Sequence, residues 1–209
     1  MTKKDSYHHG DLRRKIIDEA LFWIERENII SLSLRGIARR LGVSHNAPYR
    51  HFPDKESLLV EIAEIGFSQL NRALEQALDC QADNDRERLE NIGVAYIRYA
   101  VANQAYYRVM FSDCQLICDK YPKLNQIFEQ AFMVLLNVIK VGQEAKVFIA
   151  EDSRQLARVC WSLTHGVSML AIDNQFTISE EKLLELARMA TRIVSRGLSK
   201  EQKSEFDLA

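Results

Sequence analysis

Apolar residues recur every three or four positions along most of this chain, a spacing typical of amphipathic α-helices. Among the 209 residues only 8 are glycine and 3 are proline, too few for the many tight turns of a β-sandwich or barrel. The sequence therefore predicts an all-α fold of about nine helices. These helices are expected at residues 11–27, 33–41, 45–51, 56–78, 86–103, 104–118, 122–143, 152–172 and 179–197.

The wider composition indicates where such a helical protein works. Charged residues interrupt every apolar run before it reaches the length of about 20 residues that spans a bilayer. The first ten residues are polar, unlike a signal peptide, and the four cysteines form no CxxC motif. We therefore expect a cytoplasmic protein with no membrane contact and no cofactor.

The net charge of −1 conceals two regions of opposite sign. Residues 1–59 carry eleven Lys or Arg against eight Asp or Glu, whereas the rest of the chain has an excess of four acidic residues. Residues 30–55 are the most basic stretch, with five basic side chains against Asp54 alone. We expect a basic domain at residues 1–60 and a larger, acidic helical domain at 61–209.

The most basic stretch also has the layout of a helix-turn-helix, two short helices joined by a glycine-containing turn. Ser33 is suited to cap the first helix, and Gly42 to end it in the left-handed conformation. Ser44 would cap the second helix. That helix contains Pro48, and proline inside a helical ladder costs about 3 kcal/mol, so the helix is expected to start at Ser44 or His45 and to remain short.

A seven-residue second helix would be roughly 10 Å long and would fit the major groove of DNA, roughly 12 Å wide. Asn and Arg side chains can bond bidentately to adenine and guanine, whereas Lys and Ser hold phosphates and fix register. Base-contacting candidates in that helix are His45, Asn46, Tyr49 and Arg50. Phosphate-contacting candidates are Ser33, Ser44 and Lys55.

The segment from Ser31 to Leu59, SLSLRGIARRLGVSHNAPYRHFPDKESLL, resembles the DNA-binding head of the TetR family of bacterial transcriptional regulators. The resemblance implies base or phosphate contacts for Arg35 and a packing role for Phe52, and it includes His51, which joins the DNA-binding candidates. The chain departs from the family at Pro48, where Leu is more frequent. The lead-in from Tyr7 to Arg13 resembles one subgroup of the family.

The same subgroup carries a regulatory domain with a Trp-His-Gly signature, which Trp161, His165 and Gly166 resemble. On a helix Trp161 and His165 share a face, and Gly166 would allow another helix to approach closely. His165 can be interpreted as a ligand contact, as a pH switch or as a satisfied core residue. Lys146 follows the helix at 122–143 where related sequences often have Gly, so the turn there is expected to be built differently.

The larger domain is rich in aromatic and sulfur side chains, the usual lining of a small-molecule site. An apolar or aromatic effector is therefore expected, although such stripes are more often core. The candidate effector-binding residues are Tyr96, Tyr99, Tyr107, Phe111, Phe128, Phe132, Trp161, His165 and Met169.

The last two expected helices have broad apolar faces, and the resemblance implies that they pair with their copies in a homodimer. Two recognition helices about 34–36 Å apart would read both halves of a palindromic operator in double-stranded DNA. The expected function is that of a repressor released from DNA by its effector.

Two other interpretations remain open. A redox- or metal-responsive regulator would depend on Cys114 and Cys118, which are four residues apart on one helical face. A helical enzyme would use Cys114 or His165 with Ser162 or Asp113. It lacks a convincing nucleophile, base and orienting group, and the sequence has no phosphate-binding glycine loop or HExxH motif.

Overall fold

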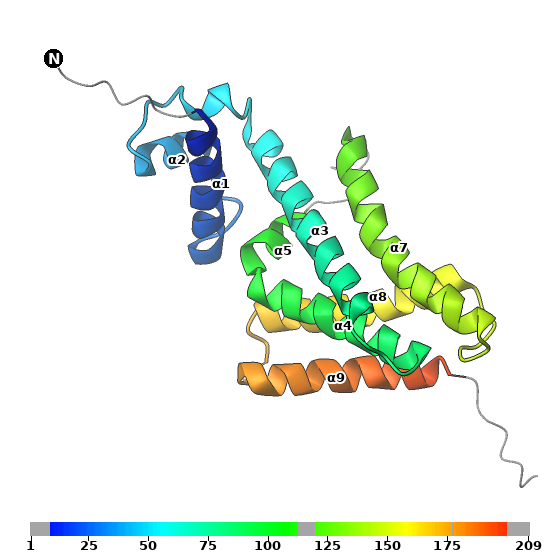
Figure 1. The fold of residues 1–209 in the computed structure, drawn as a ribbon. Coiled ribbons are helices and arrows are strands. Elements are labelled where there is room, and N and C mark those ends of the chain that lie inside the picture. Colours follow the sequence, from blue (N-terminus) through cyan, green and yellow to red (C-terminus); the bar gives the residue numbers. More distant parts are fainter. Residues whose placement is uncertain (1–8, 113–119, 177, 200–209) are drawn as a thin grey trace, which may run out of the picture. The chain divides into compact units, whose positions relative to one another are not determined.

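The computed structural model describes residues 9–112, 120–176 and 178–199, and within them it contains eight α-helices and one short 3₁₀ helix (Figure 1). The prediction of an all-α fold is confirmed. The helices are α1 (His9–Arg26), α2 (Leu34–Arg40), η1 (Pro48–Arg50), α3 (Lys55–Asp79), α4 (Asp85–Ala102), α5 (Gln104–Phe111), α7 (Pro122–Glu144), α8 (Ser153–Ile172) and α9 (Glu180–Gly197). None of these helices is long and apolar enough to cross a membrane.

The chain folds as two compact units, and the first comprises residues 1–67 and 103–125. In its described part, α1 contacts α2, η1 and α5. Its core contains the fully buried side chains of Ile16, Ile37, Phe52, Leu58 and Tyr107. Burial of Phe52 agrees with the packing role that the family resemblance implies.

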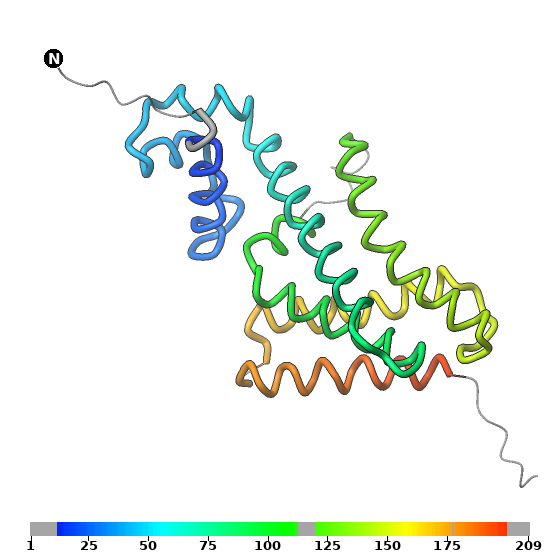
Figure 2. The backbone as a smooth tube through the Cα atoms, in the orientation of Figure 1, coloured from blue at the N-terminus to red at the C-terminus, as the bar shows by residue number. Residues whose placement is uncertain are grey.

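The second unit comprises residues 68–102 and 126–209, and α4, α8 and α9 pack against one another within it. Ile97, Val167, Ala187 and Ala190 form the buried core between these three helices. The tube in Figure 2 shows α9 returning beside α8 in the opposite direction.

Three helix ends in the described residues close with a residue in the left-handed region. Gly42 has φ 66°, Lys146 φ 60° and Asn174 φ 54°. In each, the next residue donates its N–H to a carbonyl five residues earlier, for example Val147 N to Gly142 O at 2.8 Å. This is the Schellman arrangement, which satisfies carbonyls left open at a helix end. Lys146 therefore takes a conformation that favours glycine.

Two of the expected helices are wrong, one in its type and the other in where it ends. Residues 45–51 do not form an α-helix, because Ser44 to Ala47 is a turn and only Pro48–Arg50 is helical, as a 3₁₀ turn. The helix expected at 104–118 ends at Phe111, since Ser112 is extended with ψ 132°. The Ser112 hydroxyl donates to the carbonyl of Val109 at 3.0 Å, a local bond that competes with helix continuation. Residues 113–119 lie outside the described residues.

Candidate nucleic-acid interface and effector site

The predicted DNA-reading segment begins where α2 ends. Ser33 caps α2 as predicted, its Oγ accepting from Gly36 N at 3.1 Å. At the other end, Gly42 turns the chain in the left-handed conformation, while Val43 N donates to Ala38 O at 3.0 Å. The segment from Ser44 to His51 therefore leaves α2 in a defined direction.

Proline at position 48 explains why this segment is not an α-helix. An α-helix would need an N–H at residue 48 to reach the carbonyl of Ser44, and proline has none. The Ser44 carbonyl instead accepts from Ala47 N at 2.9 Å, and His51 N donates to Pro48 O at 2.9 Å. Both bonds span three residues, the spacing of turns and of a 3₁₀ helix.

The predicted base-contacting side chains lie on the surface of the first unit. His45, Asn46 and Arg50 are exposed, and 43% of Tyr49 is exposed. Arg35 on α2 and Ser44 in the turn are exposed as well, whereas His51 is half-buried. The structure thus brings donors and acceptors of the types that read base edges to one short stretch of surface.

Lys55, a predicted phosphate contact, binds within its own unit. Its Nζ donates to the carbonyls of Ile29 at 2.6 Å and Ile30 at 3.0 Å. Partial burial lowers the pKa of Lys55. An ammonium group has three N–H donors, so one remains for a phosphate while two hold the loop between α1 and α2.

Five of the nine predicted effector-binding residues form one cluster in the second unit. Trp161 Nε1 donates to the Tyr96 hydroxyl at 3.0 Å, and that hydroxyl lies 3.4 Å from His165 Nδ1. The rings of Phe128 and Phe132 meet the Trp161 ring edge-on, with centroids 5.7 and 6.2 Å away. Except for Tyr96, these side chains are only half-buried, so the cluster is not closed within the protomer.

Burial also sets the charge of this cluster. Desolvation lowers the pKa of His165 below its ordinary value of 6.5, so the ring is neutral at pH 7. The polar atoms of the cluster are then a phenol, an indole N–H and a neutral imidazole. Such a site suits an uncharged aromatic molecule with one or two hydrogen-bonding groups.

The other predicted effector residues lie elsewhere. Tyr107 and Phe111 belong to the first unit, where their ring centroids are 4.7 Å apart and Phe111 also meets Phe67. The Tyr99 hydroxyl donates to Gln69 Oε1 at 3.4 Å in the second unit. Met169 is half-buried on α8.

Asn71 is a polar residue that sequence reasoning missed. It is buried on α3, and its Nδ2 donates to the Ile127 carbonyl on α7 at 3.1 Å. Its Oδ1 is buried without a hydrogen-bond partner among the described residues. The available signal was a lone amide among the buried apolar positions of the helix, between Leu70 and Leu74.

The cysteine hypotheses fall mainly outside the described residues. Cys114 and Cys118, with Asp113, lie in the stretch 113–119. Cys160 is buried on α8, and burial raises the pKa of its thiol to about 12. Among the residues that the structure describes, no three His, Cys, Asp or Glu side chains are grouped to hold a metal ion.

Two family descriptions match the chain. Residues 16–62 match "Bacterial regulatory proteins, tetR family", and residues 89–194 match "Tetracyclin repressor-like, C-terminal domain". The first match contains the whole reading segment. The second covers just over half of the chain and contains Tyr96, Trp161 and His165.

Individual proteins resemble the chain over much of its length. A protein of unknown function from Rhodococcus sp. RHA1 is 28% identical, with a TM-score of 0.78 over 94% of this chain and 100% of that one. A tetR-family regulatory protein from Rhodococcus RHA1 is 22% identical, with a TM-score of 0.75 over 90% and 96%. This second likeness concerns the fold alone.

A curated relative is the nucleoid occlusion factor SlmA of Aliivibrio fischeri, 28% identical over 135 residues, or 61% of this chain. The matched region spans 66% of that relative's length, just under two thirds. The helix-turn-helix match and the extended match to the C-terminal domain agree on one assignment. The chain belongs to the TetR family of helix-turn-helix transcriptional regulators, a family of DNA-binding proteins rather than enzymes.

Proposed function

We propose that this protein is a homodimeric repressor that binds a palindromic operator through the major groove and is released by a small-molecule effector. Residues 1–60 would bind DNA, and residues 61–209 would bind the effector and form the dimer. The regulatory part would be of the Trp-His-Gly type, and the protein would act in the cytoplasm.

The observation that carries this proposal is the surface of the segment Ser44 to His51. Asn46 and Arg50 are exposed there and are of the residue types that can form bidentate bonds to adenine and guanine, each worth about 1–3 kcal/mol of discrimination. One such segment contacts only a few base pairs. A dimer with reading segments about 34–36 Å apart would contact two half-sites one helical turn apart.

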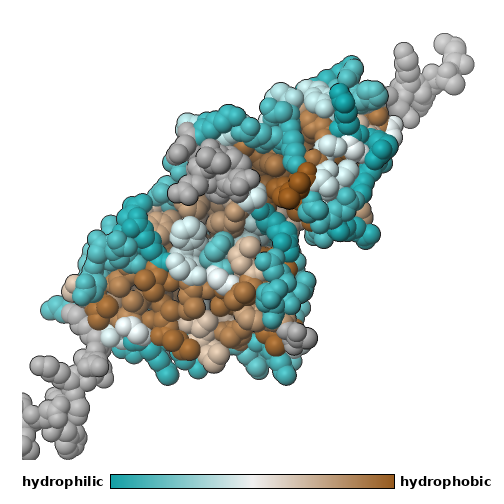
Figure 3. Space-filling view, turned by 180° about the vertical axis from the view of Figure 1, so that it is seen from behind, coloured by the Kyte–Doolittle hydropathy of each residue, from teal (hydrophilic) through white to brown (hydrophobic). Residues whose placement is uncertain are grey.

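Apolar stripes on α8 and α9 support the dimer. Val159 and Leu170 on α8 are 59% and 45% exposed, and Met189 and Ile193 on α9 are 53% and 62% exposed. Gly166 lies on the same face of α8 as Val159 and Leu170, and a Cβ built on it meets nothing within 4 Å. Figure 3 shows a broad hydrophobic area on the second unit. Exposed apolar areas of this kind mark interfaces, here with a second copy.

The half-buried cluster of Tyr96, Phe128, Phe132, Trp161 and His165 supports an aromatic or apolar effector. A ligand there would complete the packing around Trp161 and accept or donate hydrogen bonds at Tyr96 and His165. Binding would favour a dimer geometry that no longer matches the two half-sites.

Selection of DNA from a random pool by the full-length protein tests the proposal. We expect enrichment of a palindrome with half-site centres one helical turn apart. The matched control is the double variant Asn46→Ala, Arg50→Ala, which should enrich no sequence. Enrichment of a non-palindromic site, or none by the unmodified protein, would contradict the proposal.

The effector part has its own experiment. Uncharged aromatic compounds are added to the protein on its selected duplex, and release is followed by fluorescence anisotropy. We expect some compounds to release DNA from the unmodified protein but not from Trp161→Ala, which should still bind DNA.

The repressor mode is tested by a reporter for the regulated promoter. Reporter expression should rise when the gene for this protein is deleted, and a fall would contradict the repressor mode.

A further inference from the structure

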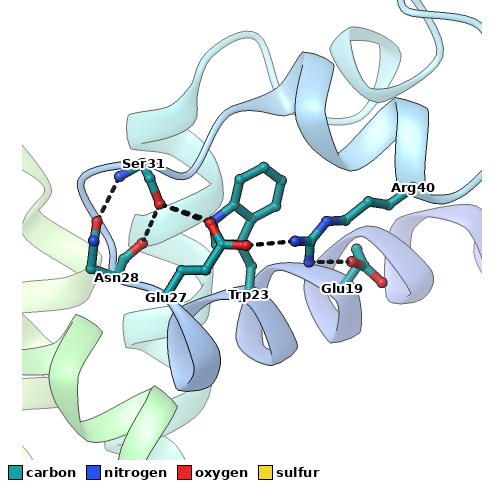
Figure 4. A network of polar contacts seen from close by, with 6 residues as sticks. All are labelled: Glu19, Trp23, Glu27, Asn28, Ser31 and Arg40. Atoms are coloured by element: carbon teal, nitrogen blue, oxygen red, sulfur yellow. Dashed lines mark hydrogen bonds and ion pairs between the residues drawn. The ribbon is translucent and has the colours of Figure 1, made fainter.

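Arg40, the last residue of α2, belongs to the most basic stretch of the chain, yet its side chain is held by acidic residues. Its Nη1 lies 3.2 Å from Glu19 Oε1, and its Nη2 lies 2.6 Å from Glu27 Oε1. Both glutamates are on or directly after α1. Figure 4 shows the guanidinium lying between the two carboxylates.

Trp23 on α1 completes this arrangement. The Arg40 Cζ lies 4.1 Å from the centroid of the Trp23 ring, a cation–π contact. The indole Nε1 donates to Ser31 Oγ at 3.0 Å, and Ser31 N donates to Asn28 Oδ1 at 2.8 Å, which joins the loop after α1 to the same network (Figure 4). We call Glu19, Trp23, Glu27 and Arg40 the α1–α2 clamp.

The Trp23 ring also touches the backbone of α2 from the side. A Cβ built on Gly36 would lie 2.5 Å from Trp23 Cη2, so only glycine leaves room for the ring at this distance. Trp23 itself is 7% exposed. The clamp therefore fixes α2 at two points, through Gly36 near its start and through Arg40 at its end.

The charges of the clamp argue against a phosphate contact by Arg40. One guanidinium faces two carboxylates, so this local group has a net negative charge. The planar fork of arginine bonds both carboxylates while its face stacks on the indole, a combination that lysine does not reproduce. A phosphate would have to displace at least one carboxylate to reach the same donors.

We propose that Arg40 is a positioning residue and that the α1–α2 clamp sets the direction of the DNA-reading segment. Gly42 turns the chain two residues after Arg40, and Ser44 to His51 follow at once. A shift of the end of α2 would therefore displace Asn46, Tyr49 and Arg50 together. This inference rests on the proposed reading of DNA by that segment.

The inference is testable because it predicts that removing one negative charge weakens DNA binding, the opposite of the ordinary electrostatic effect. Removing a negative charge from a DNA-binding unit ordinarily strengthens binding to the polyanion. The clamp gives the opposite expectation for Glu27→Gln on a specific site. We expect its affinity for the selected duplex to fall about tenfold, the order of one lost base contact.

The experiment uses the full-length protein, the duplex recovered by selection, and a scrambled duplex of equal length. The variants are Glu19→Gln, Glu27→Gln, Arg40→Lys and Arg40→Ala. Glu25→Gln is the matched control, because Glu25 is exposed on α1 and carries the same charge. Affinity is measured over a range of salt concentrations, and circular dichroism verifies that each variant is folded.

We expect Glu27→Gln and Arg40→Lys to lose preference for the selected duplex over the scrambled one, while Glu25→Gln retains it. Combining Arg40→Ala with Glu27→Gln should weaken specific binding no more than Arg40→Ala alone, because both break one network. Arg40→Ala should leave the salt dependence unchanged. Loss of a phosphate contact would instead lower the slope by about 0.9.

Three results would overturn the inference. Glu27→Gln could behave as Glu25→Gln does, Arg40→Lys could bind as the unmodified protein does, or Arg40→Ala could lower the salt slope as a lost phosphate contact would. If the unmodified protein recovers no duplex, the proposed function fails and this inference fails with it. If the unmodified protein binds and the variants behave in any of these three ways, only the inference fails.

Discussion

Burial changes the chemistry of two side chains in the second unit, His165 and Cys160. Desolvation disfavours the charged form of each, so it lowers the pKa of the imidazole and raises that of the thiol. Both residues lie on α8, five positions apart. Each gives a prediction that needs no knowledge of the operator or the effector.

The first prediction concerns the pH dependence of stability. Because the folded-state pKa of His165 lies below the unfolded value of about 6.5, the unfolded chain binds more protons between the two values. The free energy of unfolding should therefore fall as pH is lowered through 6.5 toward the folded pKa. Urea unfolding of the protein and of His165→Gln between about pH 5.5 and 8 measures this contribution. Parallel curves for the two proteins would contradict it.

The second prediction concerns thiol reactivity. The thiolate is the nucleophile, and a pKa of about 12 leaves almost none of it at Cys160 at pH 8. Iodoacetamide should alkylate Cys160 at least about tenfold more slowly than the exposed Cys80. Mass spectrometry of tryptic peptides distinguishes the two, and in urea their rates should converge. Equal rates in the folded protein would show that Cys160 is accessible.

Sequence reasoning identified the chemical types of the site residues better than their partners. Ser33 was predicted as a cap and is one, because capping depends on residues only three apart. Arg40 was counted only among the basic side chains of residues 30–55, and the structure pairs it with Glu19 and Glu27. Those partners are 21 and 13 residues away, so local periodicity carries no information about them.

At the scale of elements, the Schellman turns at Gly42 and Lys146 form a natural pair. Both residues have positive φ, but only one is glycine. The expectation that the turn at Lys146 is built differently is therefore wrong for the backbone. The residue differs, but the backbone still takes the left-handed conformation.

Exchanging the residue types at these two turns should shift stability in opposite directions. Gly42→Ala introduces a Cβ that meets nothing within 4 Å, so it should destabilise by roughly 0.5–1 kcal/mol, the strain of the left-handed conformation less the reduced freedom of the unfolded chain. Lys146→Gly removes the same strain and should stabilise by roughly 0.5–1 kcal/mol after the added freedom of the unfolded chain. Thermal unfolding checks both values. Shifts of the same sign would contradict this account.

The reading segment shows how one residue can override a pattern. A helix was expected at residues 45–51 because two short helices joined by a glycine-containing turn are the layout of a helix-turn-helix. Pro48 removes the one N–H that would have bonded the Ser44 carbonyl, and a turn with a 3₁₀ helix results. The conflict at Pro48 is visible in the sequence, but the proline was expected in the first turn of a short α-helix.

At the scale of the whole molecule, the exposed stripe on α9 predicts a dimer that a single charge can break. Ile193→Glu should dissociate it, because a carboxylate at an apolar interface would be buried without a partner. The protomer should keep its helix content, since Ile193 is already 62% exposed in it. Arg192→Glu, turned about 100° away on the same helix, is the control. Sedimentation showing a monomeric unmodified protein would contradict the prediction.

The fold class was predictable because helical periodicity and the scarcity of glycine and proline act over the whole chain. The grouping of aromatic residues was predictable only in part. Tyr107 and Phe111, like Tyr96 and Tyr99, are aromatic residues at helical spacing, yet they belong to the other compact unit. A helix stripe indicates that a face is buried, but it does not indicate which helix will cover that face.

The clamp between α1 and α2 has a consequence for how the head can change during evolution. Because Arg40 is matched by Glu19 and Glu27 inside the same unit, a substitution at any of the three leaves the others unbalanced. Among homologues that keep tryptophan at position 23, we expect positions 19, 27 and 40 to vary together. Asn46 and Arg50, by contrast, should vary with the operator that each homologue reads.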